Sequence, residues 1–142
     1  MSLLLQSSLY AFGFYTALNA LIMLALSILV VRARVVTETL IGDDGKPTMA
    51  APLRAHANNT EYVPMALLLM WGLASPIGGS IWLIHGVGVP LTLGRLFHAF
   101  GLSRSTGTST SRFLGMILTW IAYIVGIVGL LWCVFFVQPT AQ

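Results

Sequence analysis

Charged residues are scarce in this sequence. Asp, Glu, Lys and Arg make up only 8% of its 142 residues, whereas 57% are hydrophobic. A soluble domain carries about 25% charged residues, so this chain lacks the charge needed to cover a surface that faces water. The mean hydropathy of +0.89 also indicates lipid as the main solvent. The length corresponds to a single domain that covers residues 1–142.

Cysteine is nearly absent as well. Cys133 is the one cysteine and lies inside an apolar run, which excludes an internal disulfide and a thiolate metal site. We interpret Cys133 as a small buried hydrophobic residue, and we predict no metal centre. The first ten residues also lack the positive charge with which a signal peptide begins, so we expect the first apolar segment to be retained.

Four apolar segments are long enough, or nearly so, to cross a membrane core of about 30 Å. The first, third and fourth are residues 9–31, 80–100 and 113–137. The second is free of charge only from 62 to 77, and it spans the membrane only if its helix begins near residue 53. We therefore predict an all-α membrane protein, a four-transmembrane-helix bundle with connections at 32–52, 75–80 and 101–111.

The cations of the chain are unevenly distributed. The N-terminus, the 75–80 turn and the C-terminal tail have none, because all seven lie in or beside the first and third connections: Arg32, Arg34, Lys46, Arg54, Arg95, Arg104 and Arg112. Cationic loops stay in the cytoplasm, so the pattern predicts that both termini lie outside (N-out/C-out). Membrane orientation also accounts for the sequence pI of about 9.5, and we expect no nucleic-acid partner.

A polar stripe opens the second predicted helix. At 100° per residue, Arg54, Asn58 and Glu61 fall within about 60° of one another, and Tyr62 flanks them. Ionisable groups at membrane depth are costly and are usually partnered or functional. Pro64 removes a backbone donor, which favours a bend that opens space for a ligand. The alternative is that Arg54 and Glu61 are interfacial side chains that reach water or pair with each other.

A second polar cluster lies near the end of the third predicted helix. Arg95 and His98 are three residues apart and share one helix face, and Arg112 follows the next loop. Its simplest interpretation is a positive collar at the cytoplasmic interface with an interfacial histidine. His85, in the outer half of the same helix, is interpreted as a structural histidine that forms a hydrogen bond.

Together the two clusters offer several cations, one carboxylate, an amide and a phenol at one depth. This set suits a small zwitterion that carries more negative than positive groups. Glutathione has two carboxylates, one amine and two peptide links, so it fits this pattern.

These residues carry a family resemblance. The spacing Arg54-x-x-x-Asn58-x-x-Glu61-Tyr62-x-Pro64 is similar to the signature of the MAPEG family, the membrane-associated proteins of eicosanoid and glutathione metabolism. Arg95-Leu-Phe-His98-x-x-Gly101, followed by a loop arginine, resembles a second, looser motif of the family. Length, predicted spans and loop lengths agree over essentially the whole chain. The resemblance implies a homotrimer of four-helix bundles that binds glutathione between neighbouring subunits near the cytoplasmic face.

The resemblance also implies roles by motif position. Residues that would hold glutathione are Arg54, His56, Asn58, Glu61, Tyr62, Arg95 and His98, with Arg34 or Arg32 reaching across from a neighbouring subunit. His98 stands where prostaglandin E synthase-like members have a histidine, and Leu102 stands where many members have a tyrosine. Arg112 best matches the arginine that activates the glutathione sulfur, although loop lengths vary and Arg104 is the competing candidate.

We therefore predict a glutathione transferase of the bacterial inner membrane, with its site toward the cytoplasm. Arg112 would lower the pKa of the glutathione thiol and hold the thiolate for attack on a hydrophobic electrophile from the lipid phase. One alternative is a glutathione-dependent peroxidase or isomerase of lipid-derived substrates. Another is a small transporter, which is disfavoured because the first, third and fourth spans contain no carboxylate. A third is a non-catalytic membrane protein that retains glutathione binding.

Overall fold

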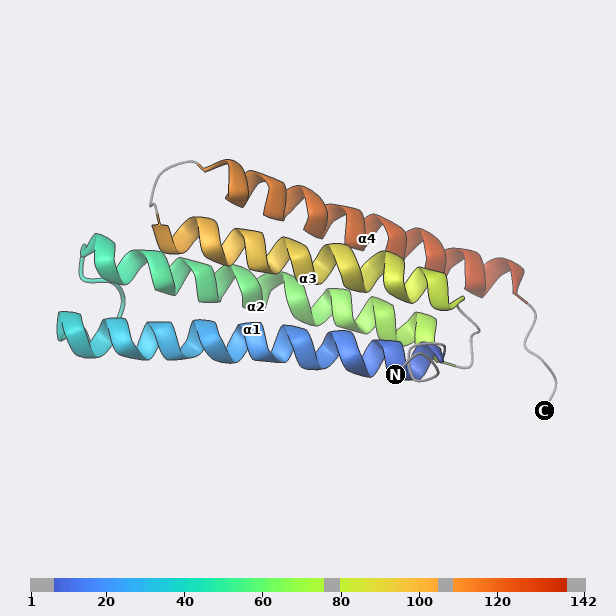
Figure 1. The fold of residues 1–142 in the computed structure, drawn as a ribbon, viewed down its shortest axis with the longest axis horizontal. Coiled ribbons are helices and arrows are strands. Elements are labelled where there is room, and N and C mark those ends of the chain that lie inside the picture. The colour runs from blue at the N-terminus through green and yellow to red at the C-terminus, as the bar shows by residue number, and fades with distance from the viewer. Residues whose placement is uncertain (1–6, 76–79, 105–108, 138–142) are drawn as a thin grey trace.

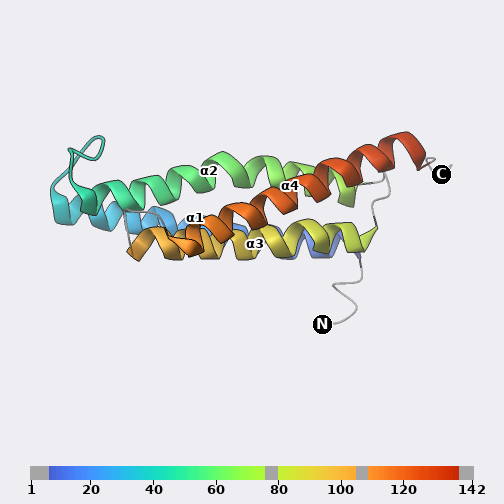
Figure 2. The ribbon, with the colours of Figure 1, turned by 90° about the horizontal axis from the view of Figure 1, so that it is seen from above.

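The structure, a computed structural model, describes residues 7–75, 80–104 and 109–137, with side chains from 102 to 104 excepted. Four helices make up the described chain: α1 (Ser8–Thr37), α2 (Pro47–Ala74), α3 (Ile81–Arg104) and α4 (Thr110–Phe136). They lie lengthwise beside one another, and the α1–α2 connection, the C-terminal end of α3 and the start of α4 are at the same end (Figures 1 and 2). The prediction of an all-helical fold is confirmed for the described residues, and Arg34, Lys46 and Arg112 lie toward this one end of the bundle.

The connection between α1 and α2 is shorter than predicted. The sequence was expected to form a loop over 32–52, but α1 continues to Thr37 and α2 already begins at Pro47. Proline is favoured at the first position of a helix because its missing N–H would have no helical partner there. Only residues 38–46 remain outside the helices, so this part of the prediction is wrong.

Arg34 and Lys46 hold this connection together. Glu38 ends α1 in the left-handed conformation (φ 55°), and its N–H bonds the Arg34 carbonyl. The Arg34 guanidinium donates to the carbonyls of Thr39 at 3.2 Å and Leu40 at 2.9 Å. The Lys46 ammonium donates to a carbonyl in the last residue of α1 at 2.8 Å. These cations therefore stabilise the local fold.

Of the described helices, α1 and α4 are long and apolar enough to cross a membrane, with mean hydropathies of 2.2 and 2.3 over their most apolar 18-residue windows. Most buried polar side chains lie instead on α2 and α3, among them Asn59, Thr92 and Arg95. A helix with polar residues on its inward face has a lower mean hydropathy even when its outward face is apolar.

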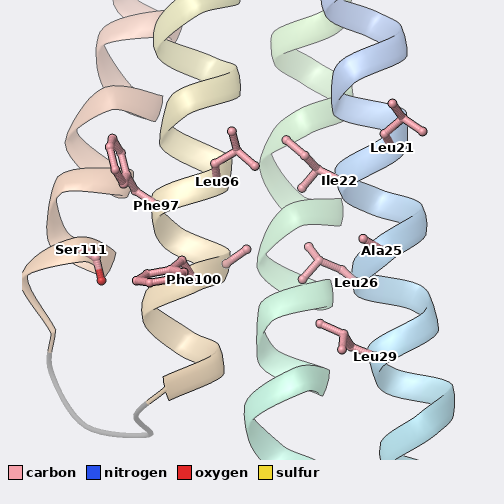
Figure 3. A pocket seen from close by; sticks show the side chains of 10 residues that line it. Leu21, Ile22, Ala25, Leu26, Leu29, Leu96, Phe97, Phe100 and Ser111 are labelled. Carbon is pink, nitrogen blue, oxygen red and sulfur yellow. The ribbon is translucent and has the colours of Figure 1, made fainter.

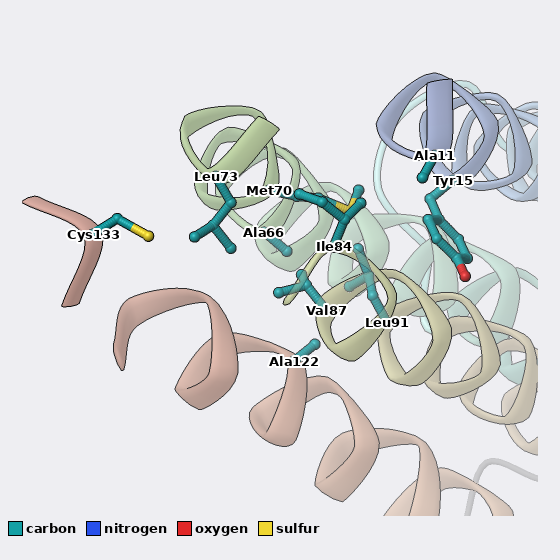
Figure 4. Packing of buried hydrophobic residues seen from close by; sticks show 10 residues of the cluster. All are labelled: Ala11, Tyr15, Ala66, Met70, Leu73, Ile84, Val87, Leu91, Ala122 and Cys133. Carbon is teal, nitrogen blue, oxygen red and sulfur yellow. The ribbon is translucent and has the colours of Figure 1, made fainter. Parts of the chain in front are cut away.

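The apolar core draws on all four helices (Figure 4). Cys133 is only 2% exposed and belongs to this core, which confirms its interpretation as a buried hydrophobic residue. The inward face of α4 consists of small residues: Gly115, Thr119, Ala122, Gly126, Gly129 and Cys133. Small residues on one face let helix backbones approach closely.

The closest approach is between α3 and α4. A Cβ atom on Gly115 would lie 2.6 Å from the Gly94 carbonyl oxygen, and one on Gly94 would lie 2.8 Å from the Gly115 carbonyl oxygen. No side chain other than hydrogen fits at either position. The contact places the next turn of α4, with Thr119, beside Arg95 of α3.

Hydrogen bonds between polar side chains connect α1 to α3. The Tyr15 hydroxyl lies 2.8 Å from His85 Nδ1, and the buried Asn19 amide donates to the Thr92 hydroxyl at 3.0 Å. The first contact confirms that His85 is a structural, hydrogen-bonded histidine.

Candidate functional site

A polar cavity of about 200 Å³ lies toward the end of the bundle where residues 38–46 connect α1 to α2. Three helices line it, through Arg54, Ala57, Asn58, Glu61, His98 and Arg112. The two polar clusters of the sequence therefore meet at one place.

Helix α2 supplies the longest wall of the cavity. Arg54, Asn58 and Glu61 are four and three residues apart, so the helical repeat places them on one face, as the sequence predicts. Arg54 and Glu61 are exposed and Asn58 is half-buried. This wall offers a cation, an amide and a carboxylate in that order along the helix.

The end of α3 and the start of α4 supply the opposite wall. The Ser109 hydroxyl caps α4 by accepting from the Arg112 backbone N–H at 3.3 Å. Gly101 lets the two helices approach here, because a Cβ atom on it would lie 2.3 Å from the Ser111 hydroxyl. This packing brings His98 and Arg112 to the same cavity.

Arg95 lies behind the cavity rather than in its wall. Its side chain is 1% exposed, and one terminal nitrogen donates to Asn58 Oδ1 at 2.8 Å. The other terminal nitrogen donates to the Thr119 hydroxyl. The Tyr62 ring faces the guanidinium, with its centroid 5.5 Å from the Arg95 Cζ. The sequence places Arg95 beside a loop, but in the structure it is nine residues inside the helix end.

Three further predicted residues lie outside the wall of this cavity. Arg34 is engaged in the α1–α2 connection, His56 is half-buried elsewhere on α2, and Tyr62 packs against Arg95. The side chains of Leu102 and Arg104 are outside the described residues. Of the predicted site residues, the described chain therefore gathers Arg54, Asn58, Glu61, His98 and Arg112 at the cavity.

Sequence reasoning did not single out Thr119 and Tyr123, which support the site from α4. Thr119 accepts from Arg95, and the Tyr123 hydroxyl donates to the Tyr62 carbonyl at 2.8 Å. In the sequence, Thr119 and Tyr123 stand out only as polar residues within the apolar run 113–137. Among the described residues, no group of three or more His, Cys, Asp or Glu side chains forms a candidate metal site.

An apolar groove of about 780 Å³ runs between α1 and α3. Leu96 of α3 and Ile22 of α1 point toward each other across it (Figure 3). Apart from Ser111, the side chains that line the groove are hydrophobic. They are Leu21, Ile22, Ala25, Leu26, Leu29, Leu96, Phe97, Ala99 and Phe100.

Comparison with known proteins places the chain in a family. The model of the MAPEG family matches residues 12–132. Inner membrane protein YecN of Escherichia coli K12 is 33% identical over 118 residues, which cover 83% of this chain and 88% of YecN. The protein of the same name from Escherichia coli O6:H1 (strain CFT073) matches to the same extent. No solved structure matches the chain significantly. The chain thus belongs to the MAPEG family and is a membrane protein of that family.

Proposed function

We propose that this protein is a membrane-bound glutathione transferase that joins the glutathione thiolate to hydrophobic electrophiles. The observation that carries the proposal is the single cavity lined by Arg54, Asn58, Glu61, His98 and Arg112. It combines cations, a carboxylate and an amide, the groups that the ionic and peptide parts of glutathione require. Membership of the MAPEG family supports this ligand.

The cavity wall suits each end of glutathione. Arg54 clamps a carboxylate through two parallel hydrogen bonds, a geometry that guanidinium groups favour. Glu61, seven residues further along α2, accepts from the ammonium group. Asn58 lies between them and bonds a peptide group.

Arg112 supplies the chemistry at sulfur. A free thiol has a pKa of about 8.5, so only a few per cent is thiolate at neutral pH. A cation beside the sulfur favours the thiolate and lowers that pKa. The thiolate then attacks an electrophilic carbon, forming a C–S bond while the displaced electron pair leaves with the leaving group or moves onto the acceptor. The apolar groove between α1 and α3 supports a hydrophobic second substrate.

A homotrimer completes the site in this proposal. Small-molecule sites typically enclose about 300–1,000 Å³, more than the cavity of about 200 Å³ in one subunit. A neighbouring subunit supplies the missing wall. Arg32 is exposed, whereas Arg34 is engaged in its own connection, so Arg32 is the better candidate to reach across.

The proposed orientation has four membrane spans, both termini outside and the cavity toward the cytoplasm of a bacterial inner membrane. This orientation is supported by the cations Arg34, Lys46 and Arg112, which lie toward the same end of the bundle. The name of the Escherichia coli relative supports the inner membrane.

A glutathione-dependent peroxidase or isomerase of lipid-derived substrates is the second candidate. His98, which stands where prostaglandin E synthase-like members have a histidine, lines the cavity and favours it. Turnover of a lipid peroxide with glutathione, in the absence of conjugate formation, would select this candidate.

The proposed function is tested by calorimetry with glutathione on the detergent-purified protein, followed by an ultraviolet measurement of bound thiolate. Arg112→Ala should retain near-normal affinity but lose thiolate absorbance at neutral pH and turn over a test electrophile more slowly. Its turnover should recover partly as pH rises, because bulk hydroxide then removes the thiol proton.

Arg104→Ala is the matched control, since it removes the same charge near the same connection. If the two variants do not differ in glutathione affinity, thiolate absorbance or turnover, these arginines serve only membrane orientation. Loss of thiolate in Arg104→Ala alone would move the catalytic role to Arg104. Failure of the unaltered protein to bind glutathione would overturn the proposed function.

A further inference from the structure

Within the described part of the chain, Arg95 is a fully buried cation without an acidic partner. Its side chain is 1% exposed, and no carboxylate among the described residues forms an ion pair with it. Its contacts are neutral: Asn58 Oδ1 at 2.8 Å, the Thr119 hydroxyl, the Met116 sulfur at 3.7 Å and the Tyr62 ring. Its Nε has no partner. Burying a charge among neutral groups costs free energy, and losing any of its hydrogen bonds would raise that cost further.

The position of the guanidinium is fixed from both sides. Backbone contact between Gly94 and Gly115 fixes α3 against α4 immediately beside Arg95. Thr119 is itself held, because its hydroxyl donates to the Gly115 carbonyl at 2.8 Å while it accepts from Arg95. The planar guanidinium therefore presents its second terminal nitrogen to Asn58 in a defined direction.

This geometry determines which way the Asn58 amide points. An asparagine side chain has one acceptor oxygen and one NH₂ donor, whereas arginine has donors only. Arg95 can therefore donate only to the Asn58 oxygen, and a flipped amide would set the NH₂ group against a cation. With the oxygen turned to Arg95, the NH₂ group is the part of the amide left to serve the cavity that Asn58 lines.

We propose that Arg95 is a positioning residue that fixes Asn58 as a hydrogen-bond donor to the ligand. The ligand group at Asn58 must then be an acceptor, a carbonyl or carboxylate oxygen, and a ligand with an N–H at this point is rejected. Polar sites discriminate strongly against ligands that leave a buried group unpaired. That the acceptor belongs to glutathione rests on the proposed function.

A double-mutant cycle separates positioning from direct contact. Arg95→Met should weaken glutathione binding by roughly 5- to 50-fold in the unaltered background. In an Asn58→Ala background the same substitution should change affinity by less than about twofold, because nothing remains to be positioned. Equal losses in both backgrounds would overturn the proposal, since Arg95 would then act on the ligand or on the fold without Asn58.

Two further variants keep the test decisive if Arg95→Met does not fold. Thr119→Val is nearly isosteric, retains the charge of Arg95 and removes the hydrogen bond from the guanidinium to the Thr119 hydroxyl. It should weaken binding in the same direction and lose its effect in the Asn58→Ala background. Thr92→Val breaks the buried bond to Asn19 instead and should leave affinity unchanged. Equal losses in Thr92→Val and Thr119→Val would mean general loosening of the bundle and would refute the positioning role.

Asn58→Asp tests the direction of the hydrogen bond. A carboxylate still satisfies Arg95 but can only accept, so it would oppose the acceptor group of the ligand. We expect Asn58→Asp to bind glutathione more weakly than Asn58→Ala. The opposite order would show that Asn58 does not donate to the ligand.

A measurement without ligand separates this proposal from the proposed function. In protein labelled with ¹⁵N at asparagine, Asn58→Ala assigns the side-chain amide signals of Asn58. Thr119→Val should move these signals while leaving those of Asn19 in place. Unmoved Asn58 signals would overturn the positioning role. If the Asn58 signals move in a protein that binds no glutathione, the positioning role is supported and only the proposed function is refuted.

Discussion

Glu61 is the carboxylate that lines the polar cavity, where its polar neighbours are two arginines, an asparagine and a histidine. We expect Glu61→Gln to weaken glutathione binding by about 1.5–3 kcal/mol, at least tenfold, because it removes the charged partner of the ammonium group. Calorimetry measures the change directly. Glu38→Gln, at the exposed end of α1, is the matched control and should bind normally. An unchanged affinity in Glu61→Gln would remove this residue from the site.

The sequence predicts some of these side chains better than others. Arg54, Asn58 and Glu61 lie on one face of one helix, so the helical repeat alone brings them together. The position of Arg95 depends on Thr119, 24 residues away on another helix, and on a glycine contact between the two helices. No local pattern encodes such a contact, so spacing alone could not reveal that Arg95 lies behind the wall.

The close packing of α3 against α4 should contribute to the stability of the whole bundle. Gly115→Ala should destabilise the bundle by about 1–3 kcal/mol, because the new methyl group meets backbone that cannot rotate away. Thermal unfolding in detergent should show a lower midpoint. The control is Gly13→Ala, since a Cβ atom there meets nothing within 4 Å and alanine favours the helix. A drop of equal size in the control would refute the role of the glycine contact.

Apolar runs predict that helices exist but not where they end. The sequence predicts a start of α2 near residue 53 because the charge-free part from 62 to 77 is too short to cross a membrane by itself. In the structure, Pro47 begins the helix and Pro52 lies within it. Pro47 costs no hydrogen bond at the first position of the helix, whereas Pro52 removes the N–H that would bond the Thr48 carbonyl; the helix nevertheless continues through both prolines.

Orientation in the membrane is a property of the whole chain. In a Cys133→Ala background, a cysteine replacing Ser80 should label with an impermeant thiol reagent in intact cells. A cysteine replacing Asp44, in the α1–α2 connection, should label only after lysis, because cationic loops stay cytoplasmic. The reverse labelling pattern would overturn the proposed orientation.

Assembly is the second property at this scale. We expect native mass spectrometry in mild detergents to show a trimer, because one subunit encloses only about 200 Å³ around its polar residues. Bound glutathione should increase the trimer fraction if neighbouring subunits share the ligand. Monomers alone, across several detergents and with glutathione present, would contradict a site between subunits.

The contact between Gly94 and Gly115 has a mechanical consequence. Where two helix backbones touch, no side chain can change its rotamer to let one helix slide past the other, so we expect α3 and α4 to move together. We expect the motion that admits a ligand to come from α1, which faces this pair across the apolar groove, and from the part of α2 beyond Pro64, because Arg95 holds Asn58 against α3. Pro64, in the middle of α2, is the natural hinge for that motion, since the helix lacks a backbone hydrogen bond there.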